Sequence, residues 1–544
     1  MTTTSVARLD GWLTEGWTGI RLLAALPGFL RRSITRDQAA AVLRQRLERR
    51  EAAFLTLVGR TIFANPGSPY RDLLRLAGCE AGDLAELVRS EGVEGALHRL
   101  YQEGVYLTVE EFKGRRPVIR GSASWHVDPQ RFIDPALVRH LLGSSGGSRG
   151  APVPVPVSLA TVWSDAVDRL MIFDALGGLD WRQAHWGIPG GFALVYFLEC
   201  AAFGARCTSW FSQVDPATPS LHSRYRWSGR VMWVAGRLAG VPQPLPRYAP
   251  TDDPWPIVEW MLDVQKNGAT PHLFTYASSA VRLCQRAAAA GIALNGLKIT
   301  LGGEPITQAR LAFVEGSGAA VFKSFGSREC NAIGQGCLDP IAADDFHVLQ
   351  DRLAIVQPGV SGATDELPPA ALLLTSLLPT APITLLNVCL GDQAEFVSRS
   401  CGCPLERLGW TMHLHTVRSY QKLTAAGMNF LDVDLIRVLE QVLPARFGGS
   451  PTDYQLVEDE QADGRSSLRL LIDPAVGPLE VNEVVDAFLT TLGSHSPAER
   501  LMELHWRGEA LVQVERRKPH ATSLGKIQHL HQSRAALPAA RPQG

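Results

Sequence analysis

The sequence predicts an α/β protein in which a large N-terminal domain packs helices on mixed sheets and a small α+β domain follows. Its 544 residues exceed one ordinary domain and are enough to bury a large core. Residues 158–300 alternate helical patterns with short apolar runs, which is typical of an α/β domain. The pattern of residues 418–544 instead indicates a small α+β unit. We therefore expect one domain over 1–417, with a helical extension at 1–55, and a second domain over 418–544.

The composition describes a globular protein without a nucleic-acid or membrane signature. Hydrophobic residues make up 46% of the chain, and 53 basic residues against 54 acidic ones leave a net charge of -1, which disfavours nucleic-acid binding. The longest apolar stretch, 190–205, contains Glu199 and is too short to cross a bilayer, so it predicts a buried helix and no transmembrane segment. Asp10 and Glu15 interrupt any signal peptide. Nine cysteines without secretory features indicate reduced thiols in a cytoplasmic protein.

The N-terminal extension has a helical pattern with two interpretations. Apolar and basic residues between Trp12 and Arg32 suit an amphipathic helix on a membrane or partner surface. They equally suit a helix packed on its own domain. Pro27-Gly28 breaks the pattern early, which favours the second interpretation.

The segment 297–330 has the pattern of strand, glycine turn, helix, strand and glycine turn. Its apolar runs, 297–301 and 319–322, have the length and the flanking glycines of buried parallel strands. Parallel strands of an α/β sheet lead into loops at one edge, where ligands bind, and glycine lets the backbone approach a ligand closely. The segment therefore indicates a nucleotide pocket. Two ordinary turns of a Rossmann-like domain are the alternative for either turn taken alone.

Two motifs in this segment, Gly302-Gly303-Glu304-Pro305 and Ser324-Phe325-Gly326-Ser327-Arg328-Glu329, resemble the adenine-binding and magnesium-binding pair of the adenylate-forming superfamily, which includes acyl-CoA synthetases and luciferases. The resemblance implies that the first motif borders adenine. It also implies that the aromatic residue of the second lies along the base and that its final glutamate holds magnesium. Carried over, these roles fall on Gly303, Glu304, Pro305, Phe325, Gly326, Ser327 and, for magnesium, Glu329.

A serine- and glycine-rich phosphate loop precedes the adenine motif in that superfamily. This chain has Ser144, Ser145, Gly146, Gly147 and Ser148 at the corresponding place. Such a loop offers backbone N–H groups and hydroxyls to a triphosphate. The lysine that ends the loop in the superfamily is absent, and Arg149 is the nearby cation. The alternative is a flexible joint that runs into the proline-rich segment 152–157.

Three downstream residues complete the nucleotide site that the resemblance implies. Asp392 follows Gly391 at the end of a pair of apolar strands, and its two oxygens would accept both ribose hydroxyls. Arg418 lies at the hinge before a mobile C-terminal lid and would contact the nucleotide. Lys526, in Thr522-Ser523-Leu524-Gly525-Lys526-Ile527-Gln528, would reach the α-phosphate and the acid oxygen. A cation is needed there because charge builds on phosphorus as the carboxylate attacks.

Two aromatic segments, 186–192 and 274–279, correspond to positions that line the acid pocket in relatives. Aromatic residues beside glycines also serve as ordinary core packing, and both interpretations stay open.

A second group of residues predicts a metal site. One residue separates Cys401 from Cys403, so a tight turn can direct both thiolates at one ion. Cys337 and His347 precede them in the sequence. Three thiolates and one imidazole suit a closed, structural zinc site, and some phenylacetate-CoA ligase relatives show a similar spacing. The alternative is a set of buried free cysteines and a histidine with an ordinary hydrogen-bond partner.

The resemblance covers roughly residues 60–530 and implies an ATP-dependent ligase similar to phenylacetate-CoA ligases. The implied reaction activates a small carboxylic acid to an acyl-AMP, releases pyrophosphate and passes the acyl group to a thiol, coenzyme A. A carrier protein, a protein cysteine or a nitrogen nucleophile is the alternative acceptor. A nucleotide-binding homologue that no longer turns over is a further alternative, because the phosphate-loop lysine is missing. A Rossmann dehydrogenase is disfavoured, because no GxGxxG lies at a strand-to-helix turn.

Overall fold

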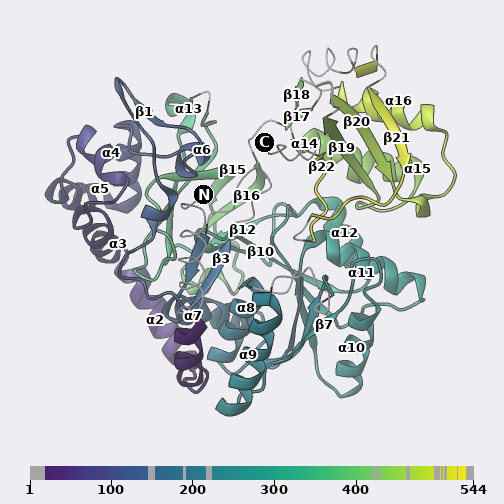
Figure 1. Ribbon diagram of the computed structural model, residues 1–544, viewed down its shortest axis with the longest axis horizontal. Coiled ribbons are helices and arrows are strands. Elements are labelled where there is room, and N and C mark those ends of the chain that lie inside the picture. Colours follow the sequence, from purple (N-terminus) through teal and green to yellow (C-terminus); the bar gives the residue numbers. More distant parts are fainter. Residues whose placement is uncertain are drawn as a thin grey trace, which may run out of the picture.

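The computed structural model describes residues 19–144, 154–187, 191–215, 223–364, 366–419, 423–425, 428–430, 432–460, 466–494, 503, 506–507, 511–522 and 525–533. A mixed sheet of 12 strands forms the centre of a large N-terminal unit, and a 4-stranded sheet forms the centre of a small C-terminal unit (Figure 1). Helices cover both sheets. The predicted α/β fold class is therefore confirmed.

One half of the large sheet is parallel and carries the predicted nucleotide segment. Its strands run in the order β10, β9, β8, β5, β6 and β7. The two strands expected within 297–330 are present as neighbours, separated by α12 (Gln308–Gly316). The strands of this half are β5 (Arg182–Gly187), β6 (Arg206–Ser212), β7 (Pro246–Tyr248), β8 (Pro271–Thr275), β9 (Lys298–Leu301) and β10 (Ala320–Ser327).

The other half of the sheet is antiparallel and begins at the far end of β10. Residues 320–323 of β10 pair with β9, whereas residues 324–327 pair with β11, so this strand joins the two halves. The remaining strands are β11 (Asn331–Gly336), β12 (Phe346–Val348), β13 (Leu353–Val356), β14 (Ala371–Ser376), β15 (Val388–Ser398) and β16 (Met412–Ser419). The expectation that Gly391-Asp392 ends a strand needs correction. These residues lie inside β15, where Gly391 has φ 101° and the pairing register shifts nearby.

Long helices bury the parallel half of the sheet. The apolar stretch expected to be a buried helix forms α8, whose Glu199 is buried and lies 2.5 Å from Arg169 of α7. No helix among the described residues has the length and hydrophobicity that a membrane span requires. The helices of this region are α7 (Leu159–Ala175), α8 (Gly191–Ala202), α9 (Ser223–Ala239), α10 (Trp255–Lys266) and α11 (Ala277–Ala289).

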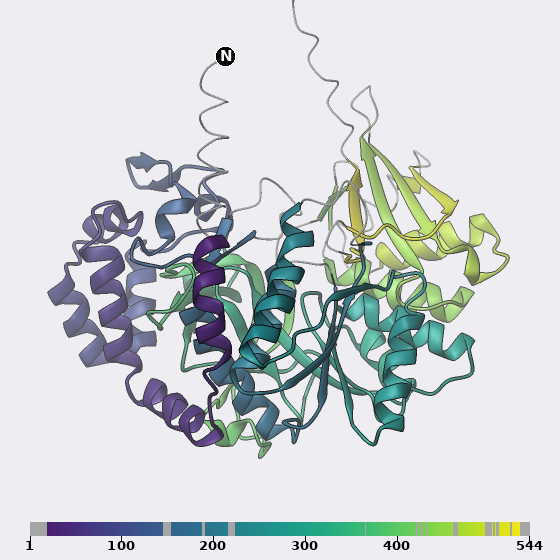
Figure 2. The ribbon, with the colours of Figure 1, turned by 60° about the horizontal axis from the view of Figure 1, so that its bottom comes forward.

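The N-terminal extension packs on its own unit over the described residues. In the helix at 19–30, Leu22, Leu26 and Phe29 are buried in the same core as α7 and α8. This helix lies beside α9, and Arg31 donates to the carbonyl of Leu238 at 3.4 Å (Figure 2). Residues 1–18 lie outside the described part of the chain. The helices that follow are α2 (Arg36–Glu48), α3 (Arg50–Val58), α4 (Tyr70–Leu76), α5 (Ala81–Gln102) and α6 (Val109–Phe112), with a π-helical turn at Gly59–Phe63.

Shorter elements connect these layers. Two hairpins are formed by β1 (Val118–Arg120) with β2 (Ala123–Trp125) and by β3 (Leu141–Ser144) with β4 (Pro154–Val157). Single helical turns lie at Pro129–Phe132, at α13 (Gly359–Gly362) and at Glu406–Leu408.

The C-terminal unit has its own hydrophobic core, which draws on residues from Leu435 onward. Its sheet has the order β21-β20-β19-β22 and packs against α14, α15 and α16. Strand β16 keeps Arg418 and Ser419, the first two residues of the expected C-terminal domain, in the large sheet. Its elements are β17 (Leu423–Ala425), β18 (Met428–Phe430), α14 (Asp432–Arg437), a π-helical turn (Val438–Val442), α15 (Leu443–Phe447), β19 (Tyr454–Glu460), β20 (Ser466–Ile472), a 3-10 turn (Pro474–Val476), α16 (Val481–Leu492), β21 (Val512–Arg516) and β22 (Leu530–Ser533).

Candidate active site

The predicted nucleotide motifs follow neighbouring parallel strands. The Gly302-Gly303-Glu304-Pro305 motif comes directly after β9, and Glu329 lies in the turn after β10. Tyr276 follows β8, the next strand on the other side of β9. Because parallel strands present their carboxyl ends at one edge of the sheet, these residues share that edge.

The loop after β9 packs against the aromatic ring of Tyr276. Gly303 has φ 73°, a conformation that L side chains rarely adopt, and a Cβ there would lie 3.1 Å from the Tyr276 ring. A side chain at this position would therefore disturb both the turn and the ring contact. Pro305 is exposed at the outer side of the loop.

The Glu304 side chain points into the protein. Its carboxylate accepts from the backbone N–H of Ser278 at 2.7 Å and from the Ser278 hydroxyl at 2.9 Å. It also lies 3.3 Å from the guanidinium of Arg310. Glu304 therefore fixes the loop to the start of α11 and to α12.

The second motif makes an irregular strand end. The pairing register of β10 shifts between Phe325 and Gly326, and a Cβ on Gly326 would lie 2.4 Å from the carbonyl of Asn331. The Ser327 hydroxyl accepts from the backbone N–H of Cys330 at 3.4 Å, which closes the turn that holds Glu329. The Phe325 ring is partly buried and packs 5.7 Å from the ring of Phe346.

The structure brings Glu329 and Asp392 near each other. Glu329 is buried, and Asp392 lies in the irregular part of β15. Burial and, to a smaller extent, the charge of Glu329 raise the pKa of Asp392 to about 7. The charge of Lys113 lowers this pKa by less.

Lys526 reaches this region from the C-terminal unit. Its Nζ donates to the carbonyl of Gly303 and lies 5.3 Å from the centre of the Tyr276 ring. Burial lowers the pKa of Lys526, Glu304 raises it and Arg328 lowers it further. Gly525 precedes the lysine with φ 71°, and a Cβ there would clash with Gln213 of the N-terminal unit. The loop is thus fitted closely to the N-terminal unit.

The nucleotide-binding roles expected of Arg418 and of the serine- and glycine-rich loop remain predictions. Arg418 donates to the buried carboxylate of Asp344 at 2.8 Å, so its guanidinium is engaged inside the protein. Ser144 ends β3, opposite Pro154 of β4, and these strands flank the predicted phosphate loop. Ser145, Gly146, Gly147 and Ser148 lie outside the described residues.

The two aromatic segments divide between the core and the site. Trp186 is fully buried and donates to the carbonyl of Ala249 at 2.8 Å, and Phe274 is buried among other rings. Both serve as core packing. Tyr276 instead faces Gly303 and Lys526, and burial raises its pKa to about 12. Arg328, from the second motif, adds positive charge near Tyr276 and Lys526.

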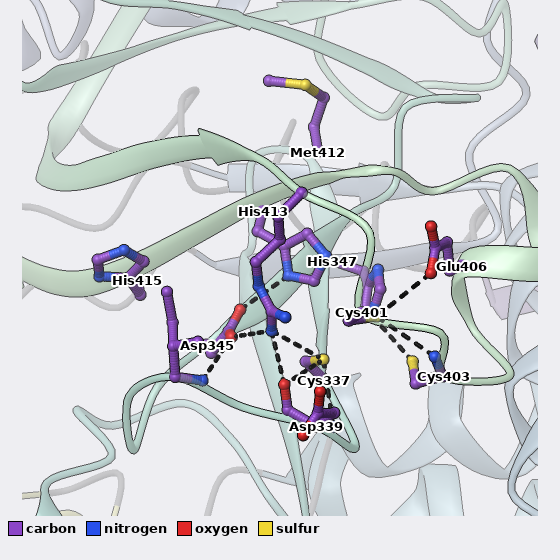
Figure 3. A network of polar contacts seen from close by, with 12 residues as sticks. Cys337, Asp339, Asp345, His347, Cys401, Cys403, Glu406, Met412, His413 and His415 are labelled. Atoms are coloured by element: carbon purple, nitrogen blue, oxygen red, sulfur yellow. Dashed lines mark hydrogen bonds and ion pairs between the residues drawn. The ribbon is translucent and has the colours of Figure 1, made fainter.

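Three of the four predicted zinc ligands, Cys337, His347 and Cys401, form one group of potential metal ligands together with His413, and Cys403 lies beside His347 (Figure 3). The Nε2 atom of His347 is 3.1 Å from Cys403 Sγ and 3.6 Å from Cys401 Sγ. Its Nδ1 atom lies 2.7 Å from the carbonyl of Trp410, which leaves Nε2 for the cluster. The Sγ atom of Cys337 lies within 4.8 Å of a ring nitrogen of His347 and of the Sγ atom of Cys401.

The structure adds a fifth donor, His413, that sequence reasoning missed. Its Nδ1 atom lies 2.9 Å from Asp345, and its buried Nε2 atom has no hydrogen-bond partner among the described residues. His413 pairs directly with His347 across β12 and β16, so only the strand register brings it to the cluster. The thiols and imidazoles in this cluster are ligand types that zinc prefers. Histidines that bind a metal usually contact a carboxylate or a carbonyl through their other nitrogen, as His347 and His413 do here.

No protein-family model matches the sequence, and no curated protein matches it either. Among solved structures, 2-hydroxyisobutyryl-CoA ligase in the postadenylation state with 2-HIB-AMP has a TM-score of 0.51 and 13% identity, covering 92% of this chain and 91% of that one.

Two further structures are similar at lower TM-scores. The same ligase with 2-HIB-AMP and CoA in the thioesterification state gives 0.44 at 14% identity over 93% of this chain and 91% of that one. O-succinylbenzoate coenzyme A synthetase from Bacillus subtilis, with ATP and magnesium, gives 0.41 at 13% identity over 72% and 69%. The first comparison shows the fold: this chain has the same two-unit α/β fold as 2-hydroxyisobutyryl-CoA ligase.

Proposed function

We propose that the protein activates a carboxylic acid with ATP, forming an acyl-AMP and pyrophosphate, and then transfers the acyl group to coenzyme A. The observation that carries this proposal is the position of Lys526, which crosses from the C-terminal unit to the carbonyl of Gly303 in the predicted adenine loop. A partly buried cation at that place suits a reaction in which negative charge builds on the α-phosphate.

The surrounding residues have complementary roles in this proposal. Glu329 would hold the magnesium ion, which supplies positive charge to the phosphates of ATP. Asp392 would accept the ribose hydroxyls, and the backbone around Gly303 would border the adenine. Lys526 would hold its proton beside the acid oxygen and the α-phosphate, and the ring of Tyr276 lies on one side of that cation.

A cavity at the seam of the two units supports coenzyme A as the acceptor. It has a volume of about 310 Å³ and lies beside the Lys526 loop. Arg282 and Lys518 line it together with one carboxylate, Asp252. The two cations suit an acceptor that carries phosphate groups, since phosphate is bound through charge-assisted hydrogen bonds. A carrier protein bearing a phosphopantetheine thiol shares this chemistry and is the alternative acceptor.

Pyrophosphate release tests the proposed function directly. Purified protein with ATP and magnesium is given phenylacetate, benzoate and fatty acids of different length, each with and without coenzyme A. Phenylacetate comes first because of the resemblance to phenylacetate-CoA ligases. Release that depends on both ATP and an acid supports adenylation, and a thioester product identifies the acceptor. Tight ATP binding without release under any condition would leave a nucleotide-binding homologue.

Replacing Glu329 by glutamine is expected to raise the magnesium concentration required for pyrophosphate release by about one order of magnitude. An amide contributes no charge to a metal site, whereas a carboxylate does. The measurement is a magnesium titration at saturating ATP. Glu395→Gln is the matched control, because Glu395 is an exposed carboxylate on β15. An unchanged magnesium dependence in Glu329→Gln would refute the metal role.

Replacing Asp392 by alanine is expected to weaken ATP binding by about 1–3 kcal/mol, the range for hydrogen bonds to a charged group. The parent protein should prefer ATP to 2′,3′-dideoxy-ATP. The variant should lose that preference, because it lacks the carboxylate that accepts the ribose hydroxyls. Calorimetric titration of both nucleotides, with Glu395→Ala as the control, measures this. Retained discrimination in Asp392→Ala would contradict the ribose role.

We also propose that Cys337, His347, Cys401 and Cys403 hold one structural zinc ion. Burial opposes ionisation of Cys403, but backbone N–H groups around it outweigh burial and lower the pKa of its thiol. A thiol that ionises readily is a suitable zinc ligand. Such an ion would attach the 399–406 loop to β12 and β16 in the antiparallel half of the sheet, which is a structural role.

A further inference from the structure

A cluster of charged side chains is buried at the seam between the two units. It consists of Glu304 and Arg310 from the N-terminal unit and Glu440 and His529 from the C-terminal unit, and we call it the seam cluster. The exposed fractions of these side chains are 4%, 1%, 0% and 9%. Groups so fully withdrawn from water need partners, and here the partners come from different units.

Arg310 connects all members of the seam cluster. Its guanidinium lies 2.7 Å from Glu440, 3.3 Å from Glu304 and 3.1 Å from Nε2 of His529. The same His529 nitrogen lies 2.5 Å from Glu440. Thr307, which caps α12, also donates its hydroxyl to Glu440. The first turn of α12 is thereby bound to the π-helical turn that carries Glu440.

Two members of the seam cluster are close in sequence to the contact between Lys526 and the adenine loop. Glu304 directly follows Gly303, whose carbonyl accepts from Lys526, and His529 lies three residues after Lys526 in the sequence. Arg310 therefore contacts one residue on each side of that hydrogen bond. Two short chain segments of different units are held in one alignment by a single guanidinium.

The rest of the C-terminal unit is coupled to this alignment through Gln455 of β19. Its amide donates to the carbonyls of His520 and Gln528 at 3.0 and 2.7 Å and accepts from the backbone N–H of His520 at 2.7 Å. The Lys526 loop is thus fastened at both ends to the sheet of its own unit. A change in how Glu440 is held would move the loop and the unit together.

We propose that Arg310 is a positioning residue, which locks the C-terminal unit in the orientation that places Lys526 for acid activation and must release Glu440 before the thiol step. This inference rests on the proposed function, in which the C-terminal unit presents different faces to the two half-reactions. Buried ion pairs are specific to one alignment because a partner left alone in the interior is strongly disfavoured.

Glu440→Gln tests the proposal, because glutamine keeps the size of the side chain and removes its charge. Acyl-AMP formation should slow by about 10-fold at saturating ATP. The apparent affinity for ATP should not change, and thioester formation from preformed acyl-AMP should be unchanged or faster. His529→Gln, a milder change that keeps a hydrogen-bonding group, should act in the same direction. Glu480→Gln, an exposed carboxylate at the start of α16, is the control.

Hydrogen exchange provides a readout that does not depend on catalysis. In folded Glu440→Gln, the backbone amides of 308–316 and 438–442 should exchange faster than in the parent protein. Faster exchange in a protein that releases no pyrophosphate would sustain the lock and overturn the proposed function. Unchanged exchange, or an equal loss in both half-reactions, would overturn the lock.

Discussion

Replacing Lys526 by alanine is expected to slow acyl-AMP formation by about 10²–10³-fold, the cost of removing one preorganised donor from developing charge. The side chain is partly buried, donates to the Gly303 carbonyl and has a lowered pKa because burial disfavours its charge. A methyl group leaves the α-phosphate without that cation. The measurement is ATP-dependent pyrophosphate release with the best acid found in the screen.

The second half-reaction separates a catalytic role from a general defect. Thioester formation from preformed acyl-AMP should change much less in Lys526→Ala, because the lysine acts while pyrophosphate departs. Lys518→Ala is not a suitable control, since it lines the proposed acceptor cavity. Arg517→Ala, at an exposed position just after β21, is preferable. Equal losses in both half-reactions, or none in either, would contradict the assignment of Lys526.

The local pattern of the central segment was sufficient to predict its structure. The apolar runs and glycine turns between residues 297 and 330 correctly predicted the parallel pair β9 and β10 with α12 between them. Their spacing also placed both motifs at one edge of the sheet, because short strands and glycine turns are set by neighbouring residues. Lys526 came to this edge only through the resemblance, since no local pattern connects it to Gly303.

Long-range features could not be predicted from the sequence. His413 reaches the cluster of cysteines and histidine through the β12–β16 register, which depends on how the antiparallel half assembles. An arginine in a short helix is usually solvated, yet Arg310 is buried because the C-terminal unit supplies Glu440. Gly391 was expected at a turn, but a glycine within an apolar run also permits an irregular strand, and β15 continues to Ser398.

Loss of the zinc ion is expected to destabilise the protein more than any other change considered above. A structural zinc site contributes apparent binding free energy on the order of 10 kcal/mol, which the folded state alone gains. Cys401→Ser and Cys403→Ser should each lower the zinc content from one ion per chain and lower the melting temperature before they affect pyrophosphate release. The zinc should survive removal of ATP and magnesium.

Elemental analysis of protein purified without a metal-affinity column measures the zinc, and thermal unfolding measures its effect. Cys79→Ser is the matched control, because Cys79 is a partly buried free thiol outside the cluster. His413→Ala examines the fifth donor, whose Nε2 atom lacks a hydrogen-bond partner. If Cys403→Ser kept its zinc while His413→Ala lost it, His413 would replace Cys403 as the fourth ligand. Substoichiometric zinc in fully active parent protein would instead make these residues an ordinary part of the core, since a structural ion has to be present in every folded chain.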